Sequence, residues 1–168
     1  MSLTKEEIKK FEKLQDKADD NTEMNSYYKD DEEYYYGNLA EDLCDAGDKE
    51  WARKIYKIVE DKMGLQIGSD SHITFANDVA INLGDKEWAR KIYKEALETA
   101  SSIYEIVELA ESIIENLGDK KWGEEVYIKA EENAEDSDEF KYLEESILKC
   151  LDDKKLVKKI RERLKKKH

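Results

Sequence analysis

The chain has 168 residues, of which 42% are charged, and its formal net charge is −13. It contains no apolar run long enough to predict a membrane span, and its charged opening, MSLTKEEIKK, predicts no cleavable signal. The sparse apolar residues exclude a thick sheet with doubly buried strands and favour a thin helical core.

The first predicted element is a helix over about residues 4–19, which a capping box of Thr4 and Glu7 opens. We expect residues 1–31 to form this helix and an acidic, tyrosine-rich connector, and residues 32–168 to form a helical repeat array. Tyrosine combines rigid contact area with a polar tip, so the cluster predicts a partner-binding surface. The alternative is that it covers the N-terminal end of the array. The candidate residues here are Tyr27, Tyr28, Tyr34 and Tyr35.

An internal repeat organises the rest of the chain. Residues 47–57 read GDKEWARKIYK, and the same eleven letters recur at 84–94. A looser copy begins at Gly118 and a degraded copy at Asp152, so successive turns are 37, 34 and 34 residues apart. A fixed period in this range indicates stacked supersecondary units.

Each unit is predicted to be a pair of helices joined by a two-residue turn. Gly118 suits the left-handed position that ends one helix, and Asp119 is a good N-cap for the next. A glycine-containing irregular segment is expected at residues 63–71. The predicted helices of the array cover residues 32–46, 48–62, 72–83, 85–100, 102–116, 119–134, 138–151 and 153–165.

These elements predict an all-α fold. We expect an α-solenoid of about four antiparallel helix-hairpin repeats with a 34–37 residue period, plus an extra N-terminal helix. Residues 154–168 carry a net charge of +8, which leaves −21 on the rest of the chain. We interpret this basic end as a soluble capping helix, because the negative field of the body repels nucleic acids and anionic membranes.

The second helix of each unit also resembles a known repeat family. The pattern of Gly84, Ala89, Tyr93 and Ala96 resembles the second helix of a tetratricopeptide repeat, whose period is about 34 residues. The family's first-helix signature and closing proline are absent, and Sel1-like or HEAT-like arrays are alternatives. The resemblance implies a non-catalytic scaffold that binds another protein on a concave face built from exposed first-helix positions. These candidates are Glu41, Asp78, Asn82, Ser112, Glu115, Ser146 and Lys149.

This candidate set lacks the basic residues that would clamp a peptide carboxylate. A basic or neutral peptide therefore suits the surface better, and electrostatics would speed the encounter with a basic partner. An alternative is that the acidic chain acts as an inhibitor or nucleic-acid mimic that blocks a basic binding site. We expect a monomer that binds no nucleic acid directly.

Motifs for catalysis and cofactors are missing. No His/Cys cluster has the spacing of a zinc site, no phosphate-binding glycine motif occurs, and the acidic residues from Asp19 do not match a calcium loop. We therefore expect no catalytic site, metal or cofactor, with an enzyme that uses His72 beside residues 63–71 as a second alternative. The two cysteines, Cys44 and Cys150, predict free thiols in a reducing, cytoplasmic protein. The periodic tryptophans are predicted to pack between repeats.

Overall fold

The computed structural model describes residues 9, 13, 32–63 and 69–167. In these ranges all regular structure is helical, so the predicted all-α class is confirmed. The helix predicted at residues 4–19 lies almost entirely outside the described residues, as do Tyr27 and Tyr28. The predicted boundary between residues 31 and 32 therefore stays a prediction.

The chain divides into two compact units, residues 1–64 and residues 65–168. The first unit contains α2 (Glu32–Asp45) and α3 (Lys49–Met63), which pack against each other. Its core includes Leu39 and Leu43 from α2, and Ile55 and Tyr56 from α3. This pair is the hairpin predicted from the first copy of the repeat.

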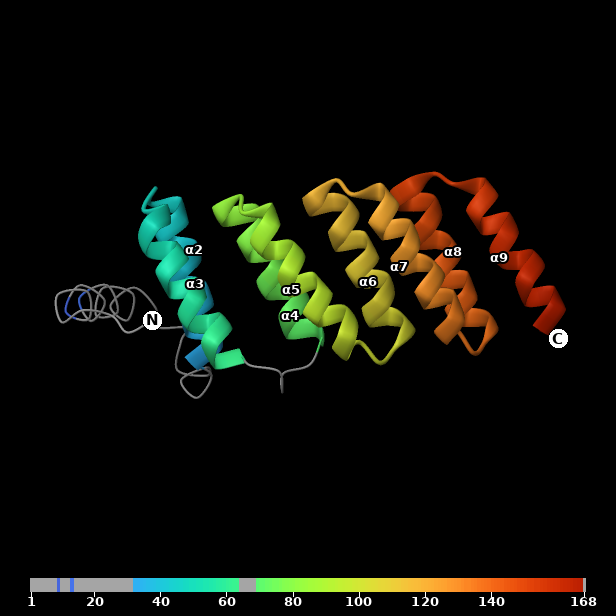
Figure 1. The fold of residues 1–168 in the computed structure, drawn as a ribbon, viewed down its shortest axis with the longest axis horizontal. Coiled ribbons are helices and arrows are strands. Elements are labelled where there is room, and N and C mark those ends of the chain that lie inside the picture. The colour runs from blue at the N-terminus through green and yellow to red at the C-terminus, as the bar shows by residue number, and fades with distance from the viewer. Residues whose placement is uncertain (1–8, 10–12, 14–31, 64–68, 168) are drawn as a thin grey trace. The chain divides into compact units, whose positions relative to one another are not determined.

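In the second unit, the described residues form six α-helices. They follow one another in space in the same order as in the sequence (Figure 1). Two helical hairpins, α4/α5 and α6/α7, are followed by α8 and α9. Helix α6 contacts both α4 and α8. Within the second unit, the first helices of successive hairpins are therefore direct neighbours. The bounds are α4 Ser69–Asp78, α5 Lys86–Thr99, α6 Ile103–Ser112, α7 Lys120–Asn133, α8 Ser137–Leu151 and α9 Lys154–Lys167.

The turns inside the hairpins form as the sequence predicts. Gly84 and Gly118 adopt φ of 73° and 74°, which a side chain would disfavour. The next residue caps the following helix, since Asp85 Oδ1 accepts from the Trp88 backbone N–H at 3.0 Å. Asp119 does the same for Trp122. Local chemistry therefore fixes where one helix ends and the next begins.

The fourth turn keeps this geometry without a glycine. Asp152 occupies the left-handed position with φ of 51°. Asp153 Oδ1 then accepts from the Leu156 backbone N–H at 3.0 Å and caps α9. The degraded fourth copy therefore forms the same joint, at the cost of a strained backbone at Asp152.

Two local features differ from the sequence-based expectations. Helix α4 begins at Ser69, three residues before its predicted start, so residues 69–71 are helical rather than irregular. In addition, α4 and α6 each end in a single π-helical turn, at Val79–Leu83 and Ile113–Leu117. Such turns insert an extra residue into a helix, and hydrophobic periodicity alone does not reveal them.

Candidate functional site

Charge is segregated between the first and second helices of the hairpins. From Ser69 to Leu83 (α4 and its π turn), and from Ile103 to Leu117 (α6 and its π turn), the chain has no lysine or arginine. Helices α5 and α7, in contrast, mix lysines with glutamates. The acidic excess of the second unit is therefore concentrated on its first helices.

Charged and aromatic side chains of α4, α6 and α8 interact with one another at the surface of the second unit. Acidic groups on neighbouring helices interact there. Partial burial raises the pKa of Glu108 on α6, and the negative charges of Asp70 on α4 and Glu111 on α6 raise it further. Glu111 of α6, and to a smaller extent Glu115 of the following π turn, raise the pKa of Lys149 on α8. We call this surface the first-helix face; it comprises Asp70, Tyr104, Glu108, Glu111, Glu115, Tyr142 and Lys149.

Two aromatic rings stand out on this face. Tyr104 of α6 is 51% exposed and Tyr142 of α8 is 37% exposed. Their ring centroids lie 5.1 Å apart and the ring planes are tilted by 52°. The pKa of Tyr142 is raised by partial burial and by the negative charges of Glu111 and Glu108. The aromatic pair therefore lies within reach of two carboxylates.

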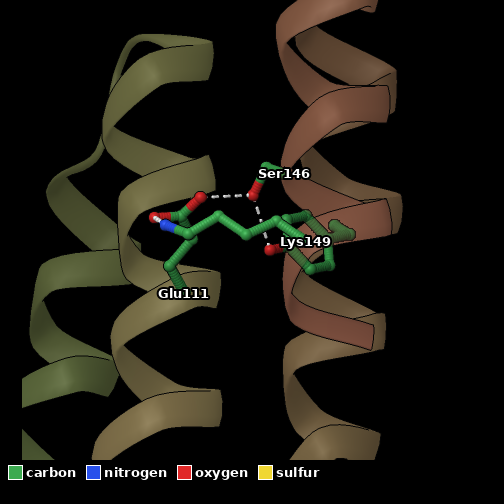
Figure 2. A network of polar contacts seen from close by, with 4 residues as sticks. Glu111, Ser146 and Lys149 are labelled. Carbon is green, nitrogen blue, oxygen red and sulfur yellow. Dashed lines mark hydrogen bonds and ion pairs between the residues drawn. The ribbon is translucent and has the colours of Figure 1, made fainter. Parts of the chain in front are cut away.

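A polar network beneath this face joins α6 to α8 (Figure 2). Ser146 Oγ donates to Glu111 Oε1 at 2.6 Å, and Lys149 Nζ donates to Glu111 Oε2 at 3.3 Å. The Tyr127 hydroxyl, from α7, lies 2.7 Å from Ser146 Oγ. Because the single serine proton is already given to Glu111, Tyr127 must donate to Ser146.

A related network joins α4 to the π turn that follows α6. The Tyr93 hydroxyl donates to Asn77 Oδ1 at 2.6 Å. Asn116 Nδ2 donates both to Asn77 Oδ1, at 2.9 Å, and to Tyr93 Oη, at 3.1 Å. Burial raises the pKa of Tyr93 to about 12, so its hydroxyl stays protonated and able to donate.

The two networks occupy equivalent positions of the repeat. Asn77 and Glu111 are 34 residues apart, and so are Tyr93 and Tyr127. In both, a fully buried tyrosine of a second helix sends its hydroxyl between two first helices. Sequence reasoning missed these bridges. The available signal was a tyrosine repeated at a core position, since a buried tyrosine hydroxyl usually needs a partner.

The predicted partner-binding residues have different outcomes. Glu41, Glu115 and Lys149 are exposed, as expected for contact positions, while Asp78 and Asn82 are half-buried. Ser112 and Ser146 are only 7% and 4% exposed, so they do not occupy the exposed positions that the repeat pattern predicted for them. They are buried because each first helix also contacts the next, which covers positions that are accessible on a single hairpin. Tyr34 and Tyr35 lie in α2, but their side chains fall outside the described part of the chain.

Other predicted features concern the histidine, tryptophan and cysteine residues. His72 is 4% exposed, so its side chain is buried. Trp122 packs edge-on against Tyr93 of the preceding hairpin at 6.5 Å, as predicted for packing between repeats, whereas Trp88 packs edge-on against Phe75 of its own hairpin at 6.0 Å. Cys44 and Cys150 are half-buried thiols, as predicted. Burial raises the pKa of the Cys150 thiol, which disfavours the reactive thiolate.

The described ranges contain neither a cluster of metal ligands nor a helix that could span a membrane. No group of three or more His, Cys, Asp or Glu side chains there is arranged to hold a metal ion. None of the described helices combines the length and apolarity needed to cross a bilayer. Comparison with protein-family models, with curated proteins and with solved structures gives no significant match. The tetratricopeptide resemblance therefore stays a prediction.

Proposed function

We propose that this chain is a non-catalytic protein-interaction module, an α-solenoid of tetratricopeptide-like hairpins that binds a basic peptide or protein segment on its first-helix face. The observation that carries the proposal is the charge segregation of the hairpins. Helices α4 and α6 present acidic groups without any lysine or arginine, whereas α5 and α7 mix both signs. The first-helix face is predominantly acidic, with Lys149 as its one basic member, and such a surface attracts a basic partner and disfavours acidic ones.

The tyrosine bridges support the same function by holding neighbouring first helices in register. Tyr127 and Ser146 connect α7 and α8 to Glu111 of α6, and Tyr93 connects α5 to the Asn77–Asn116 pair. A buried and satisfied polar network fixes a single arrangement of side chains. The exposed carboxylates above it are therefore held in place before a partner binds, which lowers the entropic cost of association.

The acidic-mimic alternative would require carboxylates spread continuously over a surface that replaces a nucleic acid. In the second unit, lysines of α5 and α7 interrupt the acidic residues on the second helices. Lys129 Nζ, for example, donates to the Leu97 carbonyl at 2.8 Å and helps to join the hairpins. A mimic would therefore have to use the first-helix face alone, and the charge-reversal experiment separates it from the binding module.

A charge-reversal experiment tests the proposal. The double variant Glu108→Lys/Glu115→Lys changes two exposed positions of the first-helix face, seven residues apart on α6 and its π turn. The matched control, Glu125→Lys/Glu132→Lys, makes the same change in net charge at two exposed positions seven residues apart on α7. Each protein serves as bait in a lysate of the source cells, washed at about 0.1 M and then about 1 M salt, because these conditions shorten the Debye length from about 10 Å to about 3 Å.

The proposal expects one partner with a basic segment to be retained by the wild type and by the α7 control, and lost by the α6 variant. Equal loss from both variants would show that only net charge matters, and would favour the acidic mimic. Equal retention by both variants would place the binding surface elsewhere and refute the proposal. Circular dichroism of each bait confirms that the comparison is between folded proteins.

A further inference from the structure

The exposed aromatic pair on the first-helix face points to a more specific ligand. We infer that Tyr104 and Tyr142 form an anchoring site for an arginine side chain of the bound segment, with Glu108 as its carboxylate partner. This inference rests on the proposed function, because it names the group that the acidic face recognises.

The geometry brings the three side chains together. Tyr104 and Glu108 are four residues apart on α6, and helical residues at this spacing share one face. Tyr142 reaches the same place from α8, with its ring centroid 5.1 Å from that of Tyr104. Tyr104 is 51% exposed and Tyr142 is 37% exposed, so part of each side chain is accessible to a ligand. A cation within about 6 Å of an aromatic face is attracted by the ring quadrupole.

The negative charges beside the two tyrosine rings are only partly balanced by cations of the chain. Glu111 is bound by Ser146 and by Lys149. In the part of the chain that the structure describes, no cation pairs with Glu108, and its described electrostatic neighbours Asp70, Glu111 and Glu105 are all acidic. An arginine from a partner would relieve this repulsion while it stacks on the rings.

The chain itself holds an arginine by the same combination of groups. The Arg90 guanidinium lies 5.0 Å from the centre of the Trp122 ring, and its Nη2 forms an ion pair with Asp119 Oδ2 at 2.9 Å. A planar guanidinium can stack on a ring while its N–H groups face a carboxylate. A lysine ammonium is more strongly hydrated and has no flat face, so we expect the site to prefer arginine over lysine.

The test uses three fluorescein-labelled peptides with the same Gly/Ser host sequence, carrying three arginines, three lysines or three citrullines. Citrulline keeps the shape of arginine but is neutral. Binding is measured by fluorescence anisotropy at about 0.1 M salt, at which exposed charges still interact over about 10 Å. The proteins are the wild type, Tyr142→Ala, Tyr142→Phe, Glu108→Gln and the charge-matched control Glu125→Gln on α7.

We expect the arginine peptide to bind more tightly than the lysine peptide, and the citrulline peptide to bind least. Tyr142→Ala should weaken arginine binding about two- to five-fold, the range for an exposed cation–π contact, while Tyr142→Phe keeps the ring and should bind like the wild type. Glu108→Gln should weaken binding of both cationic peptides, and Glu125→Gln should change neither.

The outcomes separate the two proposals. If the cationic peptides bind equally and Tyr142→Ala has no effect, the anchoring site is wrong while binding of basic segments still stands. If neither cationic peptide binds more tightly than the citrulline peptide, the acidic face does not select basic ligands, and both proposals fail. Similar losses for Tyr142→Ala and Tyr142→Phe would assign the effect to the hydroxyl and overturn the stacking arrangement.

Discussion

The contact between Gly123 and Ile114 allows a quantitative test of how the hairpins pack. Gly123 stands in α7 where the preceding copy of the repeat has Ala89. A Cβ at this position would overlap Cγ1 of Ile114 and lie 2.6 Å from its Cδ1. Carbon atoms pack at about 3.5–4.0 Å, so Gly123→Ala requires Ile114 to move.

Two opposing terms set the expected effect. Alanine is favoured over glycine in a helix interior by about 1 kcal/mol. Overpacking of a tight core costs about 1–3 kcal/mol. Gly123→Ala should therefore leave the free energy of unfolding unchanged at best, or lower it by up to about 2 kcal/mol.

The preceding repeat supplies the compensating change. Ala80 there corresponds to Ile114, and it is paired with Ala89 rather than with glycine. In an Ile114→Ala background the overlap is removed, so adding Gly123→Ala should stabilise the protein by about 1 kcal/mol. The double-mutant cycle should then give a coupling energy of about 1–3 kcal/mol between the two positions.

Urea denaturation of the four proteins, followed by far-UV circular dichroism, measures this coupling. Gly37→Ala in α2 is the matched control, because a Cβ there meets no atom within 4 Å, and it should gain about 1 kcal/mol from helix propensity alone. The packing explanation predicts different effects of Gly123→Ala in the wild type and in the Ile114→Ala background. It is refuted if both free energies of unfolding rise by the same amount as Gly37→Ala adds.

Three further predictions concern other features of the second unit. Asp152→Gly should raise the free energy of unfolding by about 0.5–1 kcal/mol, and Gly118→Ala should lower it by about 1–2 kcal/mol, because both positions are left-handed. Ser146→Ala should lower the free energy of unfolding by about 1–3 kcal/mol, and Tyr127→Phe should lower it by only about 0.5–1.5 kcal/mol. The difference arises because only Ser146→Ala leaves the buried tyrosine hydroxyl without its acceptor. Glu108→Gln should stabilise the protein at neutral pH, and this gain should vanish in acid.

The sign of the pH effect follows from the raised pKa of Glu108. A carboxyl group that binds its proton more tightly when folded destabilises the native state once it ionises. This penalty is complete above the folded-state pKa and disappears as the pH falls below the unfolded value of about 4.3. Urea midpoints of the wild type and Glu108→Gln, measured across this range, should therefore converge at low pH.

Each of these predictions has a contradicting result. A destabilised Asp152→Gly protein would mean that the aspartate side chain, rather than backbone strain, dominates at the fourth turn. Equal losses for Ser146→Ala and Tyr127→Phe would show that the tyrosine hydroxyl finds another acceptor. For Glu108→Gln, a constant difference at every pH, or the same gain from Glu125→Gln, would remove the electrostatic explanation.

The sequence by itself determined the helices and the joints between them. Gly84 and Asp85, for example, predict a left-handed helix end followed by an N-cap, and the structure has both. These features are predictable because their chemistry is local: the capping oxygen of Asp85 and the N–H of Trp88 lie only three residues apart. The repeat of 34–37 residues then showed that the same hairpin forms more than once.

Only the tertiary structure decided which first-helix positions face the solvent. Ser146 was a candidate contact residue, yet it is buried between α6 and α8, where its partners are Glu111 and Tyr127. Glu111 lies 35 residues away, so this bond depends on the register of one hairpin against the next. Periodicity shows which side of a helix is apolar, but the depth to which a neighbouring helix covers its polar margin depends on how the two helices pack.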